Sequence, residues 1–254
     1  MLIIVISRTE SYLNGAILIK ETCLSLQLDC NICYIEDLII DDKNFSKDTS
    51  YIVYFLTNVK DVSKYTDYFK RLSKSSVINN VFLISRMEKF SIQHSLYVAG
   101  VNVPKSIVVS NRNPEEVLQN LKLPLYMKSQ KQADTVIQIN TKDEFDKKIS
   151  SKSIEDFYFE ESVDMENFHL EKIYYINEYA EPRNPSFIIT DNLMDGLKKI
   201  SHVLKLDVYS VDIFFSSNTD DYKCIDVNPS SALFYSAKAR IDFVQYVLYK
   251  LANS

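Results

Sequence analysis

Glycine is scarce in this chain: the 254 residues contain only Gly15, Gly100 and Gly196. An average protein is about 7% glycine. Rossmann dinucleotide sites and P-loops both need closely spaced glycines, in the patterns GxGxxG and GxxxxGK[ST]. Neither pattern occurs here, so both of these nucleotide-binding classes are excluded.

Long hydrophobic runs are also missing. The longest apolar stretches have the length of a strand, so the sequence predicts no membrane span and no membrane partner. The N-terminal stretch MLIIVIS lacks a basic region and a small-residue cleavage site, and it does not resemble a secretory signal. We therefore expect a cytoplasmic protein whose four cysteines are reduced.

The chain has no excess of positive charge and no obvious metal-thiolate pattern. Its net charge is -5, which predicts no nucleic-acid partner. Cys30 and Cys33 form one CxxC, but no second CxxC follows and the three histidines are scattered. Ordinary burial explains this pair better than zinc or redox chemistry. With 46% hydrophobic residues, the chain is able to form a large core.

The first third of the chain alternates strand and helix patterns. Continuous apolar runs at 2–7, 51–56 and 81–85, together with ICYIE, are typical of buried parallel strands. Helical patterns cover 10–28 and 60–75. The order predicts an open parallel βαβ layer.

The remaining two thirds read as α+β. Helices are expected at 89–99, 114–120, 142–149 and 191–204 and from about 236, and Gly100 fits the end of the first. Strands are expected in VNVPKSIVVS, LPLYMKS, TVIQIN, FYFEESV, EKIYYINEY, VYSVDIFF and CIDVN. The predicted fold class is therefore mixed, α/β at the N-terminus and α+β after it.

Acidic residues interrupt the last two apolar runs. Asp212 lies within YSVDIFF, and Asp226 and Asn228 lie within CIDVN, after the short polar segment 216–221. Residues two apart on a strand share a face, so a hairpin would bring three oxygen ligands together, which suits Mg²⁺. A turn-flanking aspartate and an Asx cap before Pro229 is the better explanation for any one of them alone. For the three together we favour the metal.

The order of these elements resembles the ATP-grasp superfamily. The resemblance covers about Lys89 to Asn228 and rests on EKFSIQHSLYVAGVNVPKSIVV, LPLYMKS, FYFEESV, YSVDIFF and CIDVNPSS. It implies a two-lobed ATP-grasp fold behind the N-terminal layer, with domains at 1–87, 88–160 and 161–254. The nearest types are the ribosomal-protein glutamate ligases and glutathione synthetases, and the ATP-grasp inositol trisphosphate kinases, whose metal strand often reads D-x-N.

The resemblance also implies roles for residues around ATP and Mg²⁺. Lys128 takes the place of the phosphate-binding lysine, and FYFEESV resembles the linker whose backbone contacts adenine. HLEKIYYINE (169–178) resembles a family strand in which a basic residue, here Lys172, faces the nucleotide or the acceptor, and Arg183 matches the arginine that follows that strand. The implied ATP-binding residues are Lys89, Lys128, Glu160, Glu161, Ser162, Val163 and Lys172; the implied catalytic residues are Lys172 and Arg183; the metal ligands are Asp212, Asp226 and Asn228.

Simple explanations compete with some of these assignments. Lys128 would point to solvent if its strand were an edge strand, and Lys89 is a common type of residue at a helix start. Glu160 and Glu161 should point to opposite faces of their strand. The inward one would bind the adenine amino group or pair with Lys128, unless both belong to a solvated strand end.

The sequence departs from the family at three points. The expected phosphate loop, SQKQADT (129–135), has no glycine, Asp226 replaces the commoner glutamate, and PSSALF follows Asn228 without the usual Pro-Gly.

The expected function is a carboxylate–amine ligase that acts through an acyl phosphate on a small-molecule or peptide acceptor. An inositol-phosphate type of kinase and a non-catalytic nucleotide-binding scaffold remain alternatives. Assembly with further copies of the chain or with a partner protein also stays open.

Overall fold

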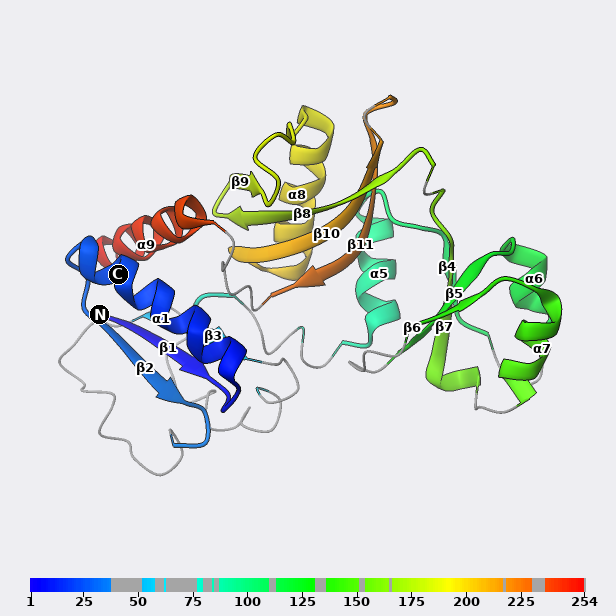
Figure 1. Cartoon of the computed structure of the whole chain (residues 1–254), viewed down its shortest axis with the longest axis horizontal. Helices are drawn as coiled ribbons and strands as arrows, with labels where there is room; N and C mark the ends of the chain where they lie inside the picture. The colour runs from blue at the N-terminus through cyan, green and yellow to red at the C-terminus, as the bar shows by residue number, and fades with distance from the viewer. Residues whose placement is uncertain are drawn as a thin grey trace.

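A computed structural model describes residues 1–37, 52–57, 62, 77–79, 84, 87–109, 113–130, 136–150, 154–164, 166–216, 218–229 and 236–253. Figure 1 shows three bodies in a row, each built on one sheet. The N-terminal and C-terminal ends of the chain lie close together on the first body. Mixed α/β architecture with one parallel and two antiparallel sheets confirms the predicted fold class.

The first body is the predicted parallel layer. Its sheet has the order β2-β1-β3 and consists of β1 (Leu2–Ile6), β2 (Cys30–Tyr34) and β3 (Ile52–Leu56). Helix α1 (Glu10–Ser25) and the last helix, α9 (Ala237–Ala252), contact each other beside this sheet. Every residue of β1 and β3 is buried, which explains why both strands read as continuous apolar runs.

Two predicted elements fall mostly outside the described residues. Of the helix expected at 60–75, only Val62 is described, and it is helical. Of the strand expected at 81–85, only Ile84 is described, and it is helical, so the strand prediction is wrong at that position. Ile84 is buried in the core of the C-terminal sheet, and an apolar run of this length does not by itself distinguish a strand from a buried helical turn.

The central sheet is antiparallel, with the order β4-β7-β5-β6. Its strands are β4 (Ser106–Ile107), β5 (Leu125–Ser129), β6 (Val136–Ile139) and β7 (Phe157–Glu161). The helices α6 (Glu116–Asn120) and α7 (Lys142–Ser150) and the 3-10 turn η3 (Ile154–Asp156) accompany it. The helix predicted at 142–149 is confirmed as α7, and it packs on the sheet through Phe145, which contacts Phe159 in the core.

The C-terminal sheet is also antiparallel, with the order β11-β10-β8-β9. Its strands are β8 (His169–Ile176), β9 (Tyr179–Pro182), β10 (Val208–Ser216) and β11 (Asp221–Asn228). Helix α8 (Asp191–Leu204) begins at a capping residue, because the Thr190 hydroxyl accepts a hydrogen bond from Leu193 N–H. The predicted pairing of the last two strands is confirmed.

Two helices pack away from their sequence neighbours. Helix α5 (Lys89–Val98) contributes Leu96 to the core of the C-terminal sheet and contacts α8. Helix α9 contributes Phe243 to the core of the N-terminal sheet. The domain limits 1–87, 88–160 and 161–254 stay a prediction. Helix α5 also contacts β4 of the central sheet, and α9 also contacts β8 of the C-terminal sheet, so these two helices link the three sheets.

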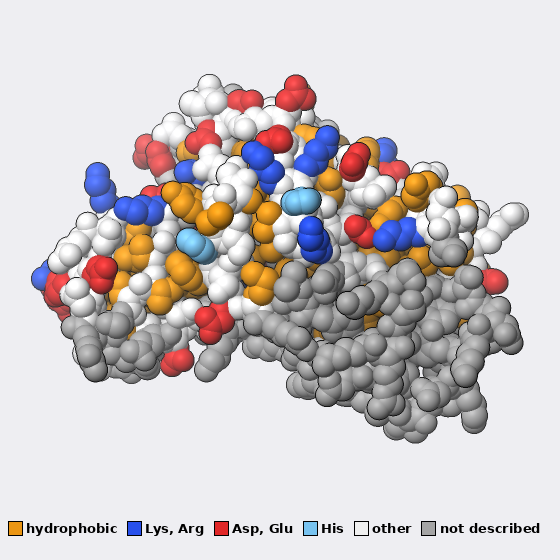
Figure 2. All heavy atoms as spheres, turned by 180° about the vertical axis from the view of Figure 1, so that it is seen from behind, with side chains coloured by type: hydrophobic (Ala, Val, Ile, Leu, Met, Phe, Trp, Pro, Cys, Tyr) orange, Lys and Arg blue, Asp and Glu red, His pale blue; other side chains and the backbone are white. Residues whose placement is uncertain are grey.

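The back of the molecule carries mixed charges. Figure 2 shows Lys and Arg side chains interspersed with Asp and Glu among hydrophobic side chains over its described part. Among the described residues, no helix is long and apolar enough to cross a membrane.

Candidate functional site

A cleft of about 360 Å³ opens between the central sheet and the C-terminal sheet. The start of α5 closes one side of it. It is lined by Lys89, Tyr126, Lys128, Val136, Tyr158, Glu160, Glu161, Val163, Phe214, Ile225 and Asp226. Six of these were predicted from the sequence as nucleotide or metal residues, and the fold brings them together from segments far apart in the chain.

The acidic strands form one wall of this cleft. Asp212 on β10 lies directly opposite Asp226 on β11, and the ladder shifts by a bulge immediately after Asp212. Asn228 lies opposite Ser210, on the same face as Asp226 by the period of two. Bulges of this kind are common next to active sites, where they re-aim a side chain.

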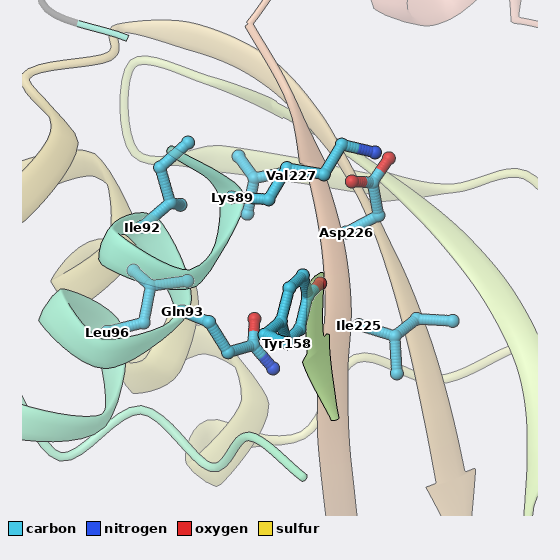
Figure 3. A pocket seen from close by; sticks show the side chains of 8 residues that line it. All are labelled: Lys89, Ile92, Gln93, Leu96, Tyr158, Ile225, Asp226 and Val227. Carbon is cyan, nitrogen blue, oxygen red and sulfur yellow. The ribbon is translucent and has the colours of Figure 1, made fainter. Parts of the chain in front are cut away.

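Asp226 lies in a partly enclosed environment. The residue is exposed to solvent, and it lines both the cleft and a smaller cavity that Lys89 also lines. Burial raises the pKa of Asp226, an effect that the positive charge of Lys89 opposes and the negative charge of Asp212 strengthens. Figure 3 shows the Lys89 ammonium group pointing toward the Asp226 carboxylate, beside a small cavity of about 30 Å³.

Lys172 continues the row of charges across the sheet. On β8 it lies opposite Asp212, and its Nζ is 2.6 Å from Asp212 Oδ1. Asp226, Asp212 and Lys172 therefore lie side by side on three neighbouring strands. Arg183 follows β9, and its backbone N–H donates to the Lys172 carbonyl at 2.7 Å while its side chain is exposed. Both predicted catalytic residues thus lie at one end of the acidic row.

Lys128 and Glu160 form the second charged pair of the cleft. Lys128 lies on β5, an inner strand of the central sheet, and its ammonium group donates to the Glu160 carboxylate on β7. Their side chains are 14% and 3% exposed. Burial raises the pKa of Glu160, although the Lys128 charge acts in the opposite direction. Lys128 is therefore not a solvent-facing edge lysine, and Glu160 does not belong to a solvated strand end.

The predicted alternation of the two glutamates is confirmed. Glu160 points inward, while Glu161 is partly exposed and its carboxylate accepts a hydrogen bond from Lys105 N–H at 2.9 Å. Glu161 ends β7, and Ser162 and Val163 then lead out of the central sheet toward β8. This short connection passes along the cleft, where Val163 is buried.

The phosphate loop expected at 129–135 is described only at its first two residues. Gln130 receives a backbone hydrogen bond from Lys89 N–H at 2.9 Å, so the beginning of the loop is fixed to the beginning of α5. The glycine-free remainder lies outside the described residues.

Several cleft residues were not found from the sequence. Gln93 is 5% exposed in the middle of α5, and its amide donates to Glu160 Oε2 at 3.4 Å. A polar residue on the buried face of a helix is the one signal that was available for it. Tyr126, Tyr158, Phe214 and Ile225 gave no signal, because aromatic and branched residues are ordinary in strands.

Metal ligands are sparse in this cleft. Among the residues that the structure describes, no group of three or more His, Cys, Asp or Glu side chains is close enough to hold a metal by itself. The carboxylates of Asp212 and Asp226 and the amide of Asn228 nevertheless suit Mg²⁺. This ion is usually held by one or two carboxylates together with substrate phosphates.

Comparison with known proteins gives matches in structure alone. No protein-family model matches the chain, and no curated protein matches it in sequence. Three solved structures cover 98% of the chain at TM-scores of 0.70 to 0.71. These matches extend over the whole length of the fold.

The first of these structures is the ATP-grasp ligase PsnB, complexed with a phosphomimetic variant of its minimal precursor, Mg and ADP, at 13% identity and with 97% of that chain covered. The second is a RimK domain ATP-grasp protein from Sphaerobacter thermophilus, at 12% identity and 100% coverage of that chain. The third is the macrocyclase MdnC from Microcystis aeruginosa, bound with its precursor peptide MdnA, at 11% identity and 100% coverage of that chain. The chain has the ATP-grasp fold.

Proposed function

We propose that this chain is an ATP-dependent carboxylate–amine ligase that forms an amide bond through an acyl phosphate. The observation that carries the proposal is the row of Asp226, Asp212 and Lys172 on neighbouring strands, which begins with Asp226 in a cleft that Lys128 lines from the central sheet. Acidic oxygens for a metal and cations for phosphates thus face the same space. Phosphoryl transfer needs mainly this kind of positioning and charge neutralisation.

ATP would lie in the cleft between the two sheets. The backbone of residues 160–163 would contact the adenine, and the apolar side chains of Phe214 and Ile225 would pack against it. Lys89 and Lys128 would hold the phosphates as mobile point charges with several donors each. Asp212, Asp226 and Asn228 would hold Mg²⁺, which neutralises charge on the phosphate oxygens when bound.

The chemistry then follows in two steps. A carboxylate oxygen of the first substrate attacks the γ-phosphorus and ADP leaves, which gives an acyl phosphate. The amine of the second substrate attacks the carbonyl carbon, inorganic phosphate leaves, and the nitrogen loses a proton. Lys172 and Arg183 would steady the acyl phosphate, since a guanidinium group is able to bind phosphate in a bidentate way.

A peptide is the proposed acceptor class. Two of the similar structures, PsnB and MdnC, contain a precursor peptide. The choice of a peptide is supported by the fold that this chain shares with PsnB and MdnC over 98% of its length. We therefore place a peptide carboxylate ahead of a free small molecule as the group to be activated.

Product analysis tests the proposal. The protein is incubated with Mg²⁺, ATP and a panel of peptides and small carboxylates, with and without amines. ADP, free phosphate and a new amide are expected together. Phosphate retained on the acceptor would instead indicate a kinase, and ATP binding without either product would leave a non-catalytic scaffold.

The Asp226→Asn variant tests the site itself. It should nearly abolish Mg²⁺-dependent turnover and leave the fold intact, because an amide is a poor substitute for an anionic ligand. Asp146→Asn removes the same charge from the exposed face of α7 and serves as the control. Unchanged turnover in Asp226→Asn would contradict the metal assignment.

A further inference from the structure

Asn79 joins the N-terminal sheet to the two strands that carry the acidic residues. It is 5% exposed, and its backbone lies in the left-handed region at φ 66°. Just before it, Val77 pairs in parallel with Val53 of β3, and Ile78 N–H donates to the Val53 carbonyl at 2.9 Å. The backbone around Asn79 is thereby attached to the first sheet.

Its side chain, in contrast, belongs to the C-terminal sheet. The Asn79 Oδ1 atom accepts hydrogen bonds from the N–H groups of Asp207 and Val208, each at 2.8 Å. The Nδ2 atom donates to the carbonyl of Val208 and, at 2.7 Å, to that of Pro229. One buried amide therefore uses both its donor and its acceptor groups on these two strands.

This arrangement replaces a missing stretch of the strand ladder. Val208 begins β10, whereas β11 ends at Asn228, opposite Ser210. The next residue, Pro229, has no N–H with which to continue the pairing. Val208 exchanges both of its backbone hydrogen bonds with the Asn79 amide, as it would with a neighbouring strand.

We infer that Asn79 is a positioning residue for the metal strand: its amide holds the end of β11 against the start of β10, and so sets the positions of Asn228 and Asp226. The inference rests on the proposed function for what those two residues bind. Pro229, one of its partners, is adjacent to Asn228 and three residues from Asp226. Among the described strands, β11 pairs with β10 alone, and its backbone bond from Cys224 N–H to the Asn102 carbonyl lies on the other side of Asp226, so a release at Pro229 would loosen the ligand-bearing residues first.

The left-handed backbone decides which variants are informative. Asn79→Ala would combine the loss of the amide with backbone strain, whereas Asn79→Gly removes the amide at no steric cost. Asn79→Asp keeps the acceptor for the two N–H groups and loses both donated bonds. Asn177→Gly is the matched control, since Asn177 also has a positive φ of 42° and is exposed in the turn between β8 and β9.

Metal affinity gives the first measurement. Mn²⁺ replaces Mg²⁺ as a paramagnetic probe, together with a non-hydrolysable ATP analogue, in the parent and in each variant. Asn79→Gly and Asn79→Asp should weaken Mn²⁺ binding about 10-fold to 100-fold, the usual cost of removing an outer-shell partner. Binding of the analogue without metal should stay as in the parent, and so should Mn²⁺ binding to Asn177→Gly. Parental Mn²⁺ affinity in both Asn79 variants would reduce Asn79 to a structural residue and overturn the inference.

Hydrogen exchange without any ligand gives the second measurement. The amides of 207–208 and of β11 should exchange faster in Asn79→Gly than in the parent, while those of β1 should not change. Equal exchange at 207–208 and in β11 would also overturn the inference. If the parent protein binds neither the ATP analogue nor Mn²⁺, that result contradicts the proposed function. The exchange rates of the β11 amides then decide the inference about Asn79 on their own.

Discussion

Lys172 and Asp212 face each other across β8 and β10, with Lys172 Nζ 2.6 Å from Asp212 Oδ1. The Lys172 ammonium group is thus already paired with an Asp212 oxygen that we propose as a ligand of the metal. Their side chains are 25% and 30% exposed, so water screens the pair in part. Without nucleotide, the lysine and a divalent cation would compete for the same oxygen.

Lys172→Met should therefore have opposite effects on metal binding and on turnover. Mn²⁺ binding to the nucleotide-free protein should strengthen about twofold to fivefold, the scale of a partly exposed ion pair. Ligase turnover should fall, because the acyl phosphate loses a cation. Lys199→Met, which breaks the Lys199–Asp195 pair on α8, is the control for losing an ion-paired lysine. Weaker metal binding in Lys172→Met would contradict competition for Asp212.

Lys128→Met should weaken ATP binding by about 1.5–3 kcal/mol, the range for a hydrogen bond to a charged group. Isothermal titration calorimetry with a non-hydrolysable ATP analogue measures this change in binding free energy. Lys198→Met, on the exposed face of α8, controls for the loss of one positive charge.

Removal of Lys128 also leaves Glu160 buried without its main partner. The double variant with Glu160→Gln separates the two effects, since it should recover stability but not ATP affinity. Parental affinity in the single variant would mean that Lys128 serves only to neutralise Glu160.

Glu160 should make stability depend on pH. Burial raises its pKa in the folded protein above the ordinary 4.5, so the folded state holds this proton more tightly than the unfolded chain. Its contribution to stability is fully present below pH 4.5 and is lost as the pH rises through the raised pKa. The free energy of unfolding of the parent should thus fall relative to Glu160→Gln across that window, by about 1.4 kcal/mol per unit of pKa shift.

Urea unfolding at several pH values measures this difference. Glu161→Gln, on the opposite face of β7, controls for the loss of one negative charge from the strand. A constant difference between the parent and Glu160→Gln across the window would show that burial of Glu160 has no net effect on its protonation.

Gly196→Ala should destabilise the protein although it lies in a helix. A Cβ at this position of α8 would overlap Tyr222 of β11, with the Tyr222 Cζ atom only 2.6 Å away. Helix propensity would favour alanine by about 1 kcal/mol, but overpacking of this kind costs about 1–3 kcal/mol. Urea unfolding should show a net loss that is smaller in a Tyr222→Leu background. An equal loss in both backgrounds would rule out the contact with Tyr222 as its cause.

Part of the geometry of the candidate site was predictable because its signals are local. The pairing of the two apolar runs that contain Asp212 and Asp226 was expected from the short polar segment between them, and the period of two correctly separated Glu160 from Glu161. Lys128 in an apolar strand indicated a charge with a partner, and Glu160 was one of the partners considered. Gln93 was missed, since the buried face of α5 is not defined until the helix packs against its neighbours.

By itself, the sequence determined most of the helices and strands and the residues that share a face along each of them. Those properties depend on neighbours a few residues apart, through the periods of 2.0 and 3.6. Only the tertiary structure decided which elements face one another. The hydrogen bonds of Asn79 to Val208 span 129 residues, and the Lys128–Glu160 pair spans 32. Such contacts depend on how sheets and helices pack, and packing constrains many residues at once without leaving a local pattern.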